Sequence, residues 1–227
     1  MPVGHAVNVL PSLRDALANG LAVPPPVPWI YGWSLKLAPN LSDWQPGDIV
    51  LVEKRGAKGA LIAAGQWAIL PSSVSSTRWS HCAIYVGAGS IVDAMPGTGI
   101  GVRQRYLHEY CPKRATALLR LDVGGKLLDH TIGQFIADEA KNLEGKPYAI
   151  GALASVAGRF LSKWLKVGQK PVRRDVRKLY CSSLVVVAYK AINIDLDYDP
   201  NVLPCMPANL LAHKDLYSQP LDWHEII

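Results

Sequence analysis

The chain has 227 residues, of which 49% are hydrophobic and 19% charged, and its formal net charge is +6 at pH 7. This length and composition predict one globular domain with a sizeable core, or one such domain with additions, and exclude a disordered protein. No run of about eighteen uncharged apolar residues occurs, so we expect no transmembrane helix. The positive charge permits attraction to polyanions such as cell wall, lipid headgroups or nucleic acid, but it selects none of them.

Residues 1–43 are rich in proline and alanine, and we expect them to form an arm packed on a single domain that spans residues 44–227. The run PPPVP at 24–28 cannot form a helix interior and is expected to be extended. A flexible leader is the alternative. The candidate anchors of the arm are Trp29, Tyr31 and Trp33.

The cysteine and histidine usage predicts a reduced protein without a metal. The four cysteines lie far apart and form no CxxC pair, so neither a disulfide framework nor a zinc knuckle is expected. The histidines show no metal-ligand spacing, and we predict no catalytic metal and no cofactor. The first residues lack the basic region and apolar core of a signal peptide, which indicates synthesis in the cytoplasm without general export.

Hydrophobic periodicity and turn residues predict alternating strands and helices. Strands are expected at 49–53, 80–86, 90–94, 102–104 and 115–123. Helices are expected at 58–70, 128–143, 149–167 and 179–189, with short helical turns at 106–110 and from about Pro207. The 128–143 helix is amphipathic, and its apolar side, the side that such a helix buries, is expected to carry Ile132, Phe135, Ile136 and Ala140.

The runs 80–86 and 90–94 are separated by GAG, which predicts a β-hairpin. A three-residue loop would pair Ala83 with Asp93 and put Asp93 on the same face as His81, one diagonal step away. A two-residue loop would shift the register by one residue and turn Asp93 to the opposite face. The sequence permits both, and contact between Asp93 and His81 depends on the odd loop length.

The segment 179–189, LYCSSLVVVAY, predicts a buried helix that begins near Cys181, with Leu184, Val187 and Ala188 on its apolar face. A thiol at a helix N-terminus lies beside unpaired backbone N–H groups and the positive end of the helix dipole. Both favour the thiolate and lower the pKa of the cysteine. The same N–H groups can hold the oxyanion of an acyl-transfer intermediate. A buried structural cysteine is the alternative.

Three residues supply the groups that nucleophilic acyl transfer needs. Cys181 is the candidate nucleophile, His81 the candidate general base, and Asp93 the candidate group that orients the imidazole. A structural or solvated histidine at the start of a strand is the alternative for His81.

Four short motifs follow one another along the chain: GDIV at 47–50, WSHCAIYVG at 79–87, IVDA at 91–94 and YCSSLV at 180–185. Together they resemble the circularly permuted NlpC-type papain-like hydrolases, which include the YiiX-like proteins and the lecithin:retinol acyltransferase relatives. In that group the histidine strand precedes the cysteine helix, as it does here. The resemblance implies an α+β papain-like fold, in which an antiparallel sheet packs against helices that include the Cys181 helix.

The resemblance also implies roles for individual residues. It gives Cys181 the role of nucleophile and His81 that of base. Asp93 stands where YiiX-like members more often have glutamate, and its shorter side chain needs closer strand pairing. Tyr148 and Tyr180 are candidate substrate-binding residues that would line the site or help the oxyanion hole.

The function implied by the resemblance is a cysteine hydrolase that cleaves amide bonds in peptidoglycan peptides. Because no signal peptide is expected, such an enzyme would reach the periplasm of a target cell through a specialised route such as type VI secretion. It would then be an antibacterial effector with a cognate immunity protein as partner.

Two other functions stay open. A lipid acyl hydrolase or acyltransferase is supported by the cationic, amphipathic stretch 159–166, which could rest on a membrane surface. A non-catalytic binding module on the same fold is the third. Nucleic acid is not an expected partner, because the basic stretch 170–178 lacks aromatic residues for stacking and offers a small footprint.

Overall fold

The structure is a computed structural model that describes residues 37–53, 59, 62, 66, 78–96, 101–110, 116–123, 126–150, 177–196, 205–219 and 223–225. The predicted arm up to residue 36, its three anchors and most of the 58–70 and 149–167 segments lie outside these residues. Within the 58–70 segment, residues 59, 62 and 66 are helical, as predicted. The division into an arm and one domain stays a prediction.

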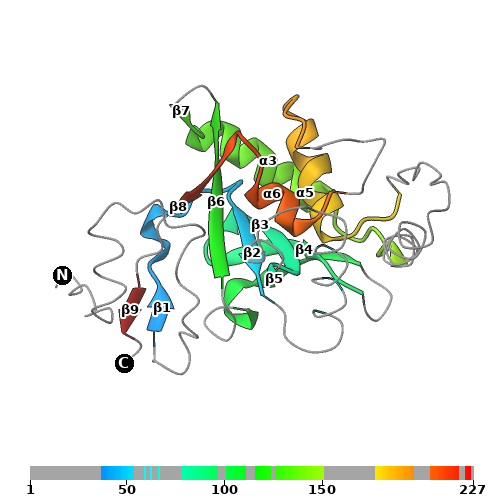
Figure 1. Cartoon of the computed structure of the whole chain (residues 1–227), viewed down its shortest axis with the longest axis horizontal. Helices are drawn as coiled ribbons and strands as arrows, with labels where there is room; N and C mark the ends of the chain where they lie inside the picture. Colours follow the sequence, from blue (N-terminus) through cyan, green and yellow to red (C-terminus); the bar gives the residue numbers. More distant parts are fainter. Residues whose placement is uncertain are drawn as a thin grey trace.

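An antiparallel sheet of seven strands forms the centre of the fold (Figure 1). Its order is β5-β4-β3-β2-β6-β7, and β8 pairs with β6. The strands are β2 (Ile49–Val52), β3 (His81–Gly87), β4 (Ser90–Ala94), β5 (Val102–Tyr106), β6 (Thr116–Val123), β7 (Lys126–Leu127) and β8 (Leu216–Gln219). A separate pair joins β1 (Leu37–Pro39) to β9 (Trp223–Glu225). The strands at β2 to β6 are those predicted, whereas β1, β7, β8 and β9 were not.

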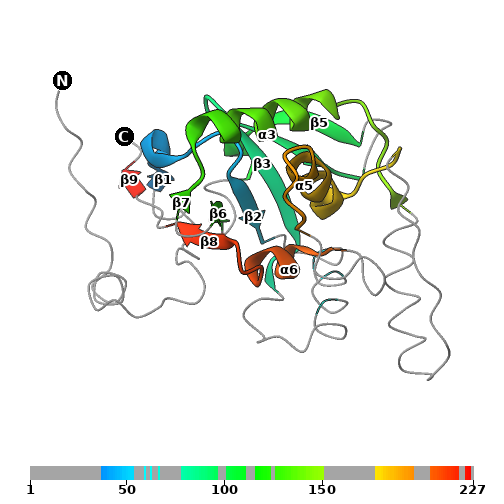
Figure 2. The ribbon, with the colours of Figure 1, turned by 90° about the horizontal axis from the view of Figure 1, so that it is seen from above.

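The helices are α3 (His130–Asn142), α5 (Cys181–Lys190) and the short α6 (Pro207–Leu211), with 3-10 turns η1 (Leu41–Asp43) and η3 (Leu107–Glu109). Helices α3 and α5 pack against each other and both contact β3 (Figure 2). The predicted α+β class, with a helix that starts at Cys181 packed on an antiparallel sheet, is confirmed. Among the described residues, no helix is both long and apolar enough to cross a bilayer.

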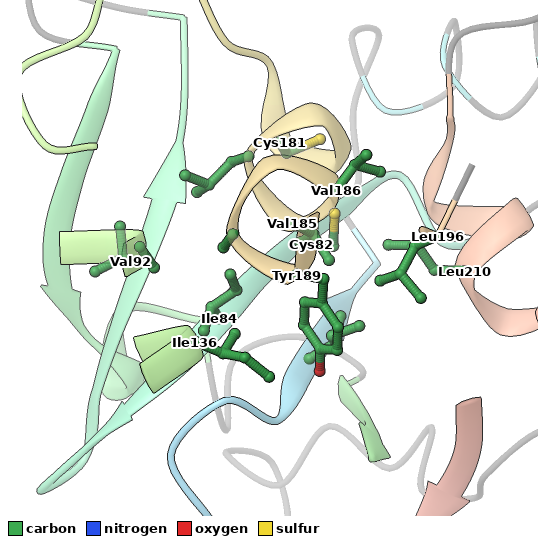
Figure 3. Packing of buried hydrophobic residues seen from close by; sticks show 14 of the residues in the cluster. Cys82, Ile84, Val92, Ile136, Cys181, Val185, Val186, Tyr189, Leu196 and Leu210 are labelled. Atoms are coloured by element: carbon green, nitrogen blue, oxygen red, sulfur yellow. The ribbon is translucent and has the colours of Figure 1, made fainter. Parts of the chain in front are cut away.

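The two faces of the sheet carry separate hydrophobic clusters, because side chains alternate along each strand. The helix-covered cluster takes Ile49 and Leu51 from β2, Cys82 and Ile84 from β3, and Cys181, Leu184 and Val185 from α5 (Figure 3). The cluster on the opposite face takes Val50, Val52, Ala83 and Tyr85, packed with Trp44, Leu107 and Tyr110. Both faces of the central strands are therefore buried.

The buried side of α3 differs from the predicted one. Gly133, Ile136, Ala137 and Ala140 are buried, whereas Ile132 and Phe135 are 42% and 63% exposed. The reason is a close backbone approach at Gly133. A Cβ atom there would lie 2.1 Å from the carbonyl oxygen of Pro46, so only glycine lets the helix rest on this turn. The assignment of Ile132 and Phe135 to the buried side is wrong, and that of Ile136 and Ala140 is confirmed.

Candidate active site

The β3–β4 hairpin has the register that brings Asp93 to the face of His81. Its loop is two residues long, since Gly87 pairs with Ser90, but the register shifts between Tyr85 and Gly87. This bulge inserts one extra residue into β3 and restores the pairing of Ala83 with Asp93. The prediction that a two-residue loop turns Asp93 away is therefore wrong, because it omitted the bulge.

His81 and Asp93 form a buried hydrogen bond, with Nε2 of His81 2.9 Å from Oδ2 of Asp93. Their side chains are 3% and 0% exposed. An ionised carboxylate only accepts hydrogen bonds, so Nε2 carries the proton in this pair. In the neutral imidazole, Nδ1 is consequently the basic nitrogen.

Two further donors hold the Asp93 carboxylate, and the sequence analysis missed both. Nε of Arg105 donates to Oδ1 at 2.8 Å, and the hydroxyl of Tyr110 donates to Oδ2, the oxygen that His81 also uses. Burial alone would raise the pKa of Asp93. The hydrogen bond and charge of His81, together with Tyr110 and Arg105, lower that pKa to about 2.

The signal for Arg105 is present in the sequence but needs a known register. Strand β5 pairs with β4 so that Asp93 lies opposite Arg103, and Arg105 stands one diagonal step away on the same face. Tyr110 follows η3, whose turn carries it back against the hairpin, and its ring centroid lies 5.4 Å from that of His81. Neither position follows from periodicity alone.

Two serines fix the start of α5 and hold Cys181 as its first helical residue. Oγ of Ser183 accepts a hydrogen bond from the N–H of Tyr180 at 2.8 Å and donates one to the carbonyl of Tyr180 at 2.9 Å. The hydroxyl of Ser182 donates to the carbonyl of Cys205 at 2.7 Å. The Cys181 side chain lies at the N-terminal end of a ten-residue helix, where the helix dipole favours a thiolate.

Cys181 is 7% exposed and lies against Cys82, the residue after His81 in β3. Burial and the hydrogen bond with Cys181 raise the pKa of the Cys82 thiol, so Cys82 stays protonated. Because neighbouring residues of a strand face opposite ways, Cys82 points toward α5 and His81 toward Asp93.

Tyr148 lies beside the segment that leads into α5. It forms a bridge with Leu179, just before α5. Burial raises the pKa of the Tyr148 phenol, and the negative charges of Cys181 and Asp93 raise it further. The half-buried phenol is therefore neutral. Tyr180, the other tyrosine singled out from the sequence, is half-buried beside Cys181.

The described residues around the candidate active site do not fit a metal ion. They contain no group of three or more His, Cys, Asp or Glu side chains that could hold an ion. Both oxygens of Asp93 receive protein donors, and one donor is the cation Arg105. A guanidinium on the carboxylate opposes the binding of a second cation there.

Comparison with known proteins identifies the fold. The sequence matches no protein-family model and no curated protein. The fold is similar to the crystal structure of the metalloprotein YiiX from Escherichia coli O157:H7, with a TM-score of 0.54 and 16% identity. The match covers 79% of this chain and 98% of that one. At this identity the likeness concerns architecture alone: the chain has an α+β fold similar to that of YiiX.

Proposed function

We propose that the protein is a thiol hydrolase in which Cys181 is the nucleophile, His81 the general base and Asp93 the group that orients the imidazole. The observation that carries the proposal is the buried hydrogen bond between Nε2 of His81 and Asp93, which makes Nδ1 the basic nitrogen. The start of α5 supplies a thiol and backbone N–H groups at one place.

The proposed reaction uses these groups in two stages. Sγ of Cys181 gives its proton to Nδ1 of His81 and attacks the carbonyl carbon, while N–H groups at the start of α5 bind the oxyanion. The imidazolium protonates the leaving group as the carbonyl bond to it breaks, and a thioester on Cys181 remains. The neutral imidazole then takes a proton from water as the water oxygen attacks the thioester carbonyl. The C–S bond breaks, the acid is released, and the sulfur of Cys181 regains its proton from the imidazolium.

The proposal requires the sulfur and the imidazole to meet around the start of β3. Alternation puts the His81 ring and α5 on different faces of the sheet, but His81 is the first residue of the strand. Contact between the two groups therefore requires Nδ1 of His81 and Sγ of Cys181 to meet beyond this first residue. The hydrogen bond between Cys181 and Cys82, the residue after His81, supports such a meeting because it puts the sulfur beside the start of β3.

The substrate that we propose is an amide bond in a peptidoglycan peptide, by resemblance to the NlpC-type hydrolases. Delivery through a specialised secretion system and a cognate immunity protein belong to the same proposal. Hydrolysis of a lipid acyl ester uses the same chemical groups, and product analysis distinguishes the two.

The test incubates the full chain with purified peptidoglycan and, separately, with phospholipid vesicles, and identifies products by mass spectrometry. Released muropeptide fragments are expected from the wild-type protein and from Cys205→Ala. The folded variants Cys181→Ala and His81→Ala are expected to release none. Release of fatty acid from the vesicles, with the muropeptides left intact, would show that the protein is a lipid hydrolase and not a peptidase. Equal effects of wild-type protein and Cys181→Ala would overturn the enzyme proposal.

A further inference from the structure

The carboxylate of Asp93 lies in an unusual charge environment for the partner of a general base. It is fully buried, and one of its oxygens is bound by the guanidinium of Arg105. The Arg105 side chain is only 9% exposed, so solvent screens this ion pair weakly. A second hydrogen bond, from Nη1 of Arg105 to Oε2 of Glu109 at 3.1 Å, holds the guanidinium in place.

A buried imidazole beside a lone carboxylate tends to keep its proton, because the negative charge stabilises the imidazolium. In catalysis that proceeds through a thioester, the imidazole must also give up this proton in each turnover. The imidazolium protonates the leaving group in the first stage, and the neutral imidazole activates water in the second. His81 therefore needs an orienting carboxylate whose charge is balanced by another group.

We propose that Arg105 is a positioning residue that balances the charge of Asp93, so that His81 both takes up and releases a proton within each turnover. Arg105 binds Oδ1, which leaves Oδ2 directed at Nε2 of His81. The guanidinium thus fixes the plane of the carboxylate and offsets its charge at the same time. The role of His81 in turnover rests on the proposed function, whereas the contact of Arg105 with Asp93 does not.

Several other titratable groups surround the His81–Asp93 pair. The Tyr110 hydroxyl donates to Asp93, and the half-exposed Glu109 carboxylate binds Arg105. The Cys82 thiol and the neutral Tyr148 phenol are affected by the charge of Asp93, and Cys181 is hydrogen-bonded to Cys82. Among the described residues, Arg105 is the permanently charged cation that forms an ion pair with Asp93. Its removal leaves the buried carboxylate with His81 as its cationic partner.

The test measures the titration of the His81 imidazole by ¹⁵N–¹H NMR in the full chain. A Cys181→Ala background removes the thiolate, so that the result does not depend on catalysis. Arg105→Met is expected to move the titration midpoint of His81 to higher pH, by about one unit, the size typical of one neighbouring charge. Arg105→Lys keeps the charge and is expected to restore most of the original midpoint.

Two further variants complete the design. Arg103→Met removes an exposed arginine from the same strand and is expected to leave the midpoint in place, because solvent screens its charge. Glu109→Gln removes the anion behind Arg105 and is expected to move the midpoint slightly to lower pH. It keeps the proposal testable should Arg105→Met fail to fold.

An unchanged midpoint in Arg105→Met, or in Glu109→Gln where Arg105→Met does not fold, would overturn the proposal. Equal shifts in Arg105→Met and Arg103→Met would overturn it as well. If the wild-type protein releases no product but Arg105→Met still shifts the midpoint, the charge balance stands and the proposed function fails.

Discussion

The hydroxyl of Tyr189 donates a 2.7 Å hydrogen bond to the backbone carbonyl of Gly47 and so ties α5 to the turn that precedes β2. Tyr189 is fully buried, and Gly47 has a φ of +89°, which favours glycine. The contact fixes the C-terminal half of the helix whose first residue is Cys181.

Tyr189→Phe is expected to lower the free energy of unfolding by about 1–3 kcal/mol, because it leaves the buried Gly47 carbonyl without this donor. Urea unfolding followed by circular dichroism measures the loss. Tyr217→Phe, at a half-exposed position on β8, is the control and is expected to change stability by less than about 0.5 kcal/mol. Equal effects of the two substitutions would show that the Tyr189 hydroxyl is not an anchor.

Gly133→Ala is expected to destabilise the fold by about 1–3 kcal/mol or more, because its methyl group would meet the backbone of Pro46 rather than a side chain that can move. Thermal unfolding tests this against Thr131→Ala, an exposed position on the same helix. A Gly133→Ala protein as stable as the wild type would mean that α3 does not rest on this turn.

The exposed position of Phe135 shows that apolar periodicity does not always predict which side of a helix is buried. Apolar periodicity correctly predicts a helix over α3, but the side that it buries is set by the backbone approach of Gly133 to Pro46. A pattern of apolar side chains does not record such an approach. The helix that begins at Cys181 was predictable, because its first residues, its thiol and its apolar face all lie within one short stretch of sequence.

The candidate site, too, could be predicted from the sequence only in part. The proximity of His81 and Asp93 was one of two predicted alternatives, and the bulge that decides between them is not encoded in loop length. Arg105 and Tyr110 reach Asp93 through the pairing of β5 with β4 and the fold of η3. Both depend on tertiary register, which a single sequence leaves undetermined.

Arg120→Met is expected to destabilise the protein by about 3–5 kcal/mol at neutral pH, since it leaves a buried carboxylate unpaired. The Asp48 carboxylate is fully buried and accepts two hydrogen bonds from Arg120, from Nε at 2.8 Å and Nη2 at 2.6 Å. Burial raises the pKa of Asp48 even with Arg120 present. The loss should therefore shrink as pH falls and Asp48 takes up a proton.

The matched control for this ion pair is the double variant Asp48→Asn with Arg120→Met, which removes both charges. It is expected to be more stable at neutral pH than Arg120→Met alone. Denaturant unfolding at two pH values measures both comparisons. A single variant whose stability loss does not depend on pH would contradict the unpaired-carboxylate explanation.

Asp93 is expected to stabilise the fold in a pH-dependent way. Its pKa in the folded protein is about 2, below the ordinary value of 3.8, so the unfolded chain binds the proton first as pH falls. The stabilisation is complete above about pH 4 and is lost as pH falls toward 2, and it amounts to about 2 kcal/mol.

The measurement compares the free energy of unfolding of the wild-type protein and Asp93→Asn from pH 6 to pH 2. The difference between them should narrow by about 2 kcal/mol over the acid range. A difference that stays constant from pH 6 to pH 2 would show that Asp93 is not held as an ionised partner of His81 and Arg105.

The rate at which iodoacetamide alkylates Cys181, followed peptide by peptide against pH, tests the central claim most directly. A thiolate paired with His81 should react near neutral pH faster than Cys82 and Cys205. His81→Ala should slow that reaction and move its midpoint up toward the ordinary thiol value of about 8.5. A Cys181 rate that follows pH like an ordinary thiol and does not change in folded His81→Ala would contradict the pairing of this sulfur with this imidazole.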